Sequence, residues 1–269
     1  NYVFPKLLAK DTDYELVLPD YAILGQKKQV GQIDEIWNFL FDNIHDVTGV
    51  IISFDTLMYS GIVPSRLHHY ALEDMLKRLH QIEKLKEINP NLIVYGFNLI
   101  MRNPTYSSSD EEPDYYADYG REIHLRGVYE HKKSLNIITE SEEADYQDIL
   151  SRLPETFYND YIDRRQKNLE INKKVIEYTS QGLIDFLIIP QDDASPYGLT
   201  ALDQKLVRAH IKKQSVMSKV YMYPGADEVA NTLLSRMINK LEGNTPTVYL
   251  RYTSEEGKKV IPLYEDRPL

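Results

Sequence analysis

Two adjacent carboxylates, Asp192 and Asp193, are the residues of this sequence best suited to chemistry. They follow the apolar run 184–189, with Pro190 and Gln191 in between. Because neighbouring carboxylates repel one another, one of them can keep its proton at neutral pH and donate it. Glycosidases use two carboxyl groups in this way, one as the acid and the other as a nucleophile or stabiliser. The alternative is that either aspartate caps the turn or helix that follows.

A second acidic pair, Asp227 and Glu228, follows the apolar run 220–223. Asp227 stands where the N-cap of a helix is expected, and Glu228 would interact favourably with the helix dipole. A capping role is therefore favoured over a role in binding. Asp55 directly follows the apolar run 50–54, and this position is compatible with a role in a site and with a purely structural role.

Arginines, tyrosines and amides also follow the apolar runs. Arginine binds carboxylate or phosphate groups through two parallel hydrogen bonds, but it can equally neutralise nearby acids. Tyrosine, of which the chain has 21, offers a flat apolar face and a hydroxyl group, and such surfaces suit sugars. The candidate substrate-binding residues are Asp55, Tyr59, Arg66, Asn98, Arg102, Tyr106, Gln191, Tyr197, Asp227 and Glu228.

Several kinds of chemistry have no support in the sequence. The chain has no cysteine, no glycine-rich phosphate loop and no HExxH motif, so we expect no cofactor and no bound metal. His68 and His69 are adjacent, and on a helix their side chains would point about 100° apart. One alternative stays open, because the carboxylates of Asp55, Asp192 and Asp227 are oxygen ligands of the type that hard divalent cations prefer.

Composition narrows the range of partners. The 269 residues carry a formal net charge of −10, which argues against nucleic acid and anionic membranes as partners. No apolar run approaches the ~18 residues of a membrane span. We therefore expect a small-molecule partner, with a sugar favoured. The lack of cysteine and of a visible signal peptide fits a cytoplasmic protein. Nothing in the sequence predicts the oligomeric state.

Short apolar runs alternate with helical patterns along the chain, which predicts an α/β fold with a mainly parallel sheet. We expect a single domain over 1–269, with a helical insertion at about 114–181. The predicted strands are 14–18, 50–54, 92–97, 184–189, 220–223 and 247–251. The main predicted helices outside the insertion are 33–44, 68–88, 201–213 and 228–241.

Four consecutive predicted strands end in polar residues. In parallel α/β folds, ligands bind at the carboxyl ends of the strands. A closed barrel draws on every strand end, whereas an open doubly wound sheet concentrates its site at one crevice. The spread of polar residues therefore favours a barrel-like arrangement over an open sheet, although six strands are visible and a complete barrel needs eight.

Five long segments are distinctive: SFDTLMYSGIVPSR (53–66), FNLIMRNPTYSSSDEEPDYY (97–116), LIIPQDDASPYG (187–198), YPGADEV (223–229) and YEDRPL (264–269). Together they resemble the bacterial family known as domain of unknown function 4127. The resemblance covers nearly the whole chain, and the family name implies no activity. Members are longer and start with a strand ending in Pro-Leu-Asp-Glu-Arg-Pro, which implies that this chain is an N-terminal half without that strand. Relatives often have Gly where this chain has Ser60.

The leading hypothesis is a carbohydrate-active hydrolase for N-acetylated or acidic sugars. Asp193 would be the general acid and Asp192 the stabilising carboxylate, or the reverse, with tyrosines lining the sugar. Two alternatives stay open. One is a hydrolase or isomerase that depends on a divalent metal, and the other is a sugar-binding protein without catalysis.

Overall fold

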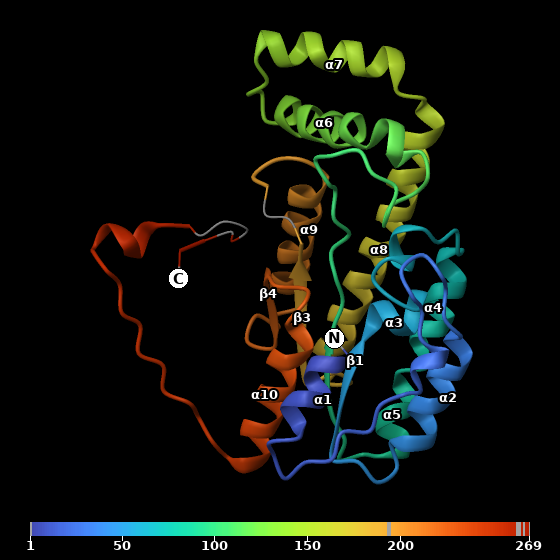
Figure 1. Ribbon diagram of the computed structural model, residues 1–269, viewed down its shortest axis with the longest axis vertical. Helices are drawn as coiled ribbons and strands as arrows, with labels where there is room; N and C mark the ends of the chain where they lie inside the picture. The colour runs from blue at the N-terminus through green and yellow to red at the C-terminus, as the bar shows by residue number, and fades with distance from the viewer. Residues whose placement is uncertain (1, 193–194, 262–264, 266, 269) are drawn as a thin grey trace.

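The computed structural model describes residues 2–192, 195–261, 265 and 267–268, and in these ranges helices alternate with four strands (Figure 1). The strands are β1 (Gly49–Ser53), β2 (Ile93–Phe97), β3 (Phe186–Gln191) and β4 (Val220–Pro224). The helices are α1 (Val3–Ala9), α2 (Ile33–Asn43), α3 (Phe54–Tyr59), α4 (Leu72–His80), α5 (Glu83–Ile88), α6 (Tyr116–Ser134), α7 (Glu140–Arg152), α8 (Glu155–Ser180), α9 (Leu199–Lys213) and α10 (Val229–Glu242). Short 3-10 helices are η1 (Tyr21–Ile23), η2 (Pro64–Arg66) and η3 (Glu256–Lys259).

The four strands form one parallel sheet in the order β1-β2-β3-β4. The prediction of an α/β fold with a mainly parallel sheet is confirmed. The prediction of a barrel-like arrangement is wrong, because β1 and β4 do not pair and the sheet stays open. Because all neighbouring strands are parallel, their carboxyl ends lie on the same side of the sheet. We call this side the carboxyl edge.

Two predicted strands are absent from this sheet. Residues 14–18 and 247–251 have no regular secondary structure. In the second segment, Val248, Tyr249 and Leu250 are 75%, 86% and 61% exposed. Strand propensity reflects packing against neighbouring strands, so a β-branched and aromatic run without such neighbours does not become a strand.

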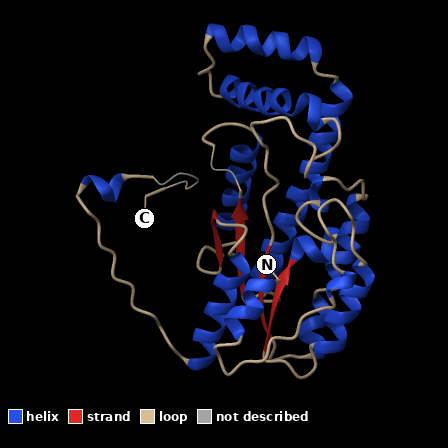
Figure 2. Cartoon of the chain, viewed as in Figure 1, coloured by secondary structure: helices blue, strands red, loops and turns tan. Residues whose placement is uncertain are grey.

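Side chains alternate between the two faces of the sheet, as the pleat requires. On one face, Val94 and Leu187 join the large core formed with α2 to α5, α8 and α9. On the other face, Tyr95 and Phe186 join a second core built on α10. Figure 2 shows the strands lying between helices. Every residue of β3 is buried, which explains why its residues 186–190 are apolar without alternation.

The predicted helical insertion corresponds to α6, α7 and α8. The helices α6 and α7 lie together at one end of the molecule, at the top in Figure 1. Their core is separate from the two sheet cores and includes Tyr116, Ile149 and Tyr161. Thr139 and Glu142 form a capping box at the start of α7. The 26-residue helix α8 continues from this core to the face of the sheet.

Gly96 in the middle of β2 allows a close approach of Phe54. A Cβ atom added at Gly96 would lie 2.5 Å from Cε2 of Phe54, whose side chain is fully buried. We expect Gly96→Ala to lower the free energy of unfolding by about 1–3 kcal/mol in urea denaturation, because the ring has no room to move.

The control is Gly257→Ala, where the nearest atom to the new Cβ would be 3.6 Å away. This variant should stay within about 0.5 kcal/mol of the wild type. Equal stability of the two variants would contradict the packing argument.

Candidate functional site

Arg66 is the centre of the cluster at the carboxyl edge. Its Nη2 donates to Oδ2 of Asp192 at 3.0 Å, across 126 positions of sequence. Its Nη1 donates to Glu111 at 3.2 Å and to Glu112 at 3.4 Å. Arg66 as a whole is only 3% exposed. A buried guanidinium therefore joins the loop after β1, the loop after β2 and the end of β3.

Arg102 reinforces the same cluster from the loop that follows β2. Its Nε donates to Oε1 of Glu112 at 2.8 Å, and its Nη2 donates to Oε2 of Glu111 at 3.0 Å. Both arginines predicted as ligand-binding residues thus contact acidic side chains of the protein. The segment 103–115 is folded back over the edge, since its two glutamates are held by Arg66 and Arg102.

Glu112 is the most unusual carboxyl group of the cluster. It is 1% exposed, and among the described residues its Oε2 atom has no hydrogen-bond partner. Burial raises the pKa of Glu112 above its ordinary value, although Arg66 and Arg102 oppose this effect. Glu112 is not among the site residues predicted from the sequence. The Glu111-Glu112 pair before Pro113 was a visible signal, but only the fold shows that one of the two is buried.

Asp55 lies beneath the surface, at the start of α3. Its carboxylate accepts hydrogen bonds from Asn98 Nδ2 at 3.2 Å and from the backbone N–H of Leu99 at 2.9 Å. Asn172 of α8 donates in turn to Asn98 Oδ1 at 2.6 Å. Burial dominates over these bonds and raises the pKa of Asp55 to about 7. Asp55 is 2% exposed, so in this structure it links β1, β2 and α8 without reaching solvent.

The predicted tyrosines do not converge on one ligand. Tyr59 is 1% exposed and stacks on His68, with ring centroids 4.7 Å apart. Tyr106 is 54% exposed. Tyr197 contacts His131 and lies beneath the Lys132 ammonium, so it packs against α6.

The remaining predicted residues are dispersed. Gln191 is the last residue of β3 and is 1% exposed. Asp227 and Glu228 are exposed at the start of α10, where Glu228 occupies the N-cap position without a side-chain capping bond. The favoured capping role for Asp227 is therefore wrong, because the helix starts one residue later than expected. Asp193 lies outside the described residues.

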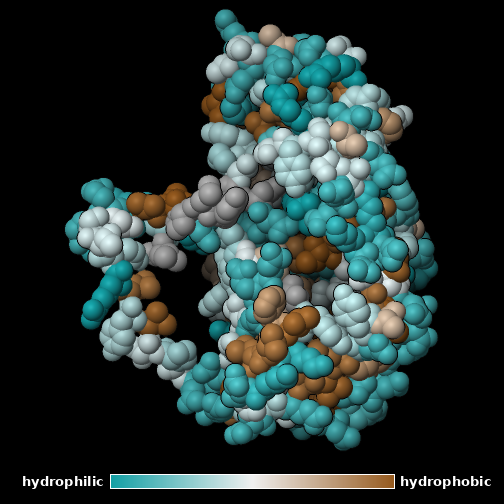
Figure 3. Space-filling model, in the orientation of Figure 1, coloured by the Kyte–Doolittle hydropathy of each residue, from teal (hydrophilic) through white to brown (hydrophobic). Residues whose placement is uncertain are grey.

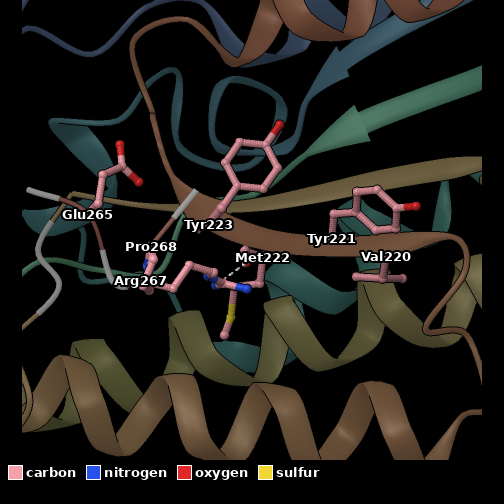
Figure 4. A pocket seen from close by; sticks show the side chains of 7 residues that line it. All are labelled: Val220, Tyr221, Met222, Tyr223, Glu265, Arg267 and Pro268. Carbon is pink, nitrogen blue, oxygen red and sulfur yellow. Dashed lines mark hydrogen bonds between the residues drawn. The ribbon is translucent and has the colours of Figure 1, made fainter. Parts of the chain in front are cut away.

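Figure 4 shows a different cleft, of about 520 Å³, along the outer side of β4. Tyr221 and Tyr223 line it on one side and Glu265 and Arg267 on the other. Arg267 donates to the backbone carbonyl of Met222 at 3.1 Å. Of the predicted site residues that the structure describes, none lines this cleft, so it is distinct from the cluster around Arg66.

The carboxylates of Asp55, Asp192 and Asp227, expected around a metal in the alternative hypothesis, are not brought together. Over residues 2–192, 195–261, 265 and 267–268, no group of three or more His, Cys, Asp or Glu side chains is arranged to hold a metal ion. In the same ranges, no helix combines the length and the apolar character needed to cross a membrane.

The fold and the cluster define an α/β protein with an open parallel sheet and a charged carboxyl edge. The chain belongs to the family described as protein of unknown function DUF4127, whose model matches residues 1–269. No curated protein and no solved structure matches the chain.

Proposed function

We propose that the protein is a carbohydrate-active hydrolase in which Glu112 is the general acid and Asp192 the partner carboxylate. The observation that carries this proposal is the placement of the two carboxyl groups on the two arms of one buried guanidinium, that of Arg66. Glu112 is buried and has a raised pKa, whereas Asp192 has a side chain that is 26% exposed. Two carboxyl groups in such different environments suit the roles of acid and base.

The spacing supports the same assignment. Glu112 and Asp192 lie 3.4 and 3.0 Å from neighbouring nitrogens of Arg66. Their carboxyl groups are therefore less than about 10 Å apart, which includes the separations used by glycoside hydrolases. Since Glu112 Oε2 is closed to solvent, the segment 103–115 must shift when a substrate binds.

The choice of a sugar as substrate has its own support. Tyr106 lies in the segment 103–115 and exposes 54% of its surface, which leaves an aromatic face for a pyranose ring. Arg102 keeps 20% of its side chain exposed beside Glu111. Arg102 pairs with Glu111 and Glu112, so the carboxylate of an acidic sugar would have to replace Glu111 on this guanidinium when the segment 103–115 shifts.

The test is a screen of the protein against a panel of neutral, N-acetylated and acidic aryl glycosides, with and without chelator. Glu112→Gln and Asp192→Asn should each lower kcat by about 10²-fold or more, because each replaces a carboxyl group that transfers a proton with an amide of nearly the same shape. Glu155→Gln is the matched control. Glu155 is also held by an arginine, Arg126, at 2.6 Å, but on α8 near the α6–α7 end.

Lack of turnover on every glycoside would refute this function in its present form. Binding of a sugar without turnover, with affinity that changes in Glu112→Gln, would instead favour the non-catalytic alternative. Loss of all turnover with chelator would favour the metal-dependent alternative.

A further inference from the structure

Glu111 is the most exposed of the three carboxylates that Arg66 holds. The exposed fraction of its side chain is 39%, against 26% for Asp192 and 1% for Glu112. Glu112 is fixed by burial, and Asp192 directly follows β3. Glu111 lies nearer the surface, where two arginines hold it. It is therefore the carboxylate of this cluster that can leave most easily.

Both hydrogen bonds that Glu111 accepts from these arginines end on the same oxygen. Nη1 of Arg66, at 3.2 Å, and Nη2 of Arg102, at 3.0 Å, donate to its Oε2 atom. A carboxylate is held most strongly when two N–H donors each bind a separate oxygen. The arginine pair thus presents two convergent donors that Glu111 uses incompletely. A carboxylate on a ligand, which is free to turn, can accept one bond on each oxygen.

Residues 105–111 form a short span that is fixed at both ends. Before it, Asn103 donates to the Tyr116 hydroxyl at 3.1 Å, and the same hydroxyl donates to the Pro104 carbonyl at 3.0 Å. After it, residues 112–113 are buried. The span itself lies at the surface, below α6 in the view of Figure 1. Release of its last residue from the arginines therefore frees a surface span and leaves both ends in place.

The charges of the cluster indicate what can take the place of Glu111. Under the proposed function, Glu112 is a general acid and must carry a proton before it reacts. Burial raises the pKa of Glu112, which favours this protonated form. Two guanidinium groups then face two carboxylates, those of Glu111 and Asp192. The departure of Glu111 leaves one positive charge in excess, which a ligand carboxylate neutralises and a neutral ligand does not.

The surroundings of the span suit a polar ligand. In the orientation of Figure 3, the surface just below the α6–α7 end is mainly hydrophilic. Tyr106, which belongs to the span, is 54% exposed, and Arg102 keeps 20% of its side chain exposed. An aromatic ring beside a guanidinium suits a sugar that carries a carboxylate.

We infer that Arg66 and Arg102 form a carboxylate subsite, that Glu111 occupies it in the free protein, and that the carboxylate of a uronic acid displaces Glu111 on binding. Glu111 is thus an internal competitor. It keeps both arginines paired when no ligand is present, and it lowers the apparent affinity for a carboxylate ligand by the fraction of molecules in which the subsite is open. Since the substrate class of the same site is named here, this assignment rests on the proposed function.

Isothermal titration calorimetry with D-glucuronate and D-galacturonate tests this subsite, because free uronates bind without turnover. Glu111→Gln keeps the length of the side chain and removes its charge, so it releases the arginines more readily. This variant should bind both uronates at least about 5-fold more tightly than the wild type does. D-Glucose and D-galactose, the neutral counterparts, should show no such gain.

Asp110→Asn is the matched control, because it removes the same charge one residue away, from an exposed position. Its affinity for uronates should equal that of the wild type. Arg102→Gln, added to Glu111→Gln, should remove the gain in affinity, because the subsite then loses one of its two guanidinium groups. Circular dichroism shows whether this double variant is folded. If it is not, the comparison of Glu111→Gln with Asp110→Asn decides alone.

Three results would overturn the assignment of the subsite. They are uronate binding by Glu111→Gln that is absent or no tighter than in the wild type, an equal gain in Asp110→Asn, and an equal gain for the neutral sugars. Failure of the proposed function gives a different result, which is lack of turnover on every glycoside. Tighter uronate binding by Glu111→Gln without turnover would retain the subsite and remove the hydrolase.

Discussion

As pH rises from about 4 to about 7, the wild-type protein should lose about 4 kcal/mol of unfolding free energy relative to the Asp55→Asn variant. Asp55 is buried, and its pKa is raised from the ordinary value of 3.8 to about 7 in the folded protein. In this pH window the unfolded chain releases the proton, while the folded protein keeps it. Folding is therefore favoured most below pH 4, and the contribution is lost by about pH 7.

The measurement is a series of urea denaturation curves at half-unit pH steps for the wild type and Asp55→Asn. The amide has the shape of the carboxyl group but does not titrate, so the difference between the two proteins isolates Asp55. Asp148→Asn, whose side chain is 62% exposed, is the control and should follow the wild type. Parallel curves for the wild type and Asp55→Asn would show that the Asp55 carboxyl group is not held in a dry environment.

Arg66→Met should lower the free energy of unfolding by about 3–5 kcal/mol at neutral pH. Arg66 is 3% exposed and holds Asp192, Glu111 and Glu112. Among the described residues, its removal leaves Arg102 as the only cation that pairs with the buried Glu112. The large effect arises because a buried charge that loses its partner keeps its desolvation penalty.

Two further variants separate this explanation from loss of packing. Arg66→Met combined with Glu112→Gln should recover part of the loss, since the buried group can then no longer be charged. Lys258→Met, at a lysine whose side chain is 50% exposed and whose partner Glu255 is 84% exposed, should cost less than about 1 kcal/mol. A double variant that is no more stable than Arg66→Met would contradict the electrostatic account.

The sequence predicted the sheet strands well where a strand is covered on both sides. The strand predicted at 184–189 corresponds to β3 (Phe186–Gln191), whose residues 186–190 are all apolar because the strand is buried on both faces. Residues 247–251 have a comparable pattern but no neighbouring strand in the structure. The pattern at 68–88 was continuous, yet it forms two helices, α4 and α5, with a break at residues 81–82. Hydrophobic periodicity does not reveal which neighbours a segment will find.

The candidate site was predictable in part. Arg66 and Asp192 were both among the candidates because each follows an apolar run, and the structure brings them within 3.0 Å. Tyr59 follows the same run as Arg66 but points into the core, because it belongs to α3 and not to a loop. Glu112 was not predicted because what distinguishes it is its burial, and that depends on contacts with Arg66, 46 residues away, as well as with the nearby Arg102.

The helix α8 has a mechanical consequence. Its 26 residues make a rod of about 39 Å. Near one end, Tyr161 packs with α6 and α7 and donates to the Arg102 carbonyl at 2.7 Å. Further along, Asn168 donates to the Ser65 carbonyl at 2.8 Å, next to Arg66. The helix is thus hydrogen-bonded to both loops that carry the arginines. The α6–α7 pair and the loops that carry Arg66 and Arg102 are therefore connected through one rigid helix, although they belong to different cores.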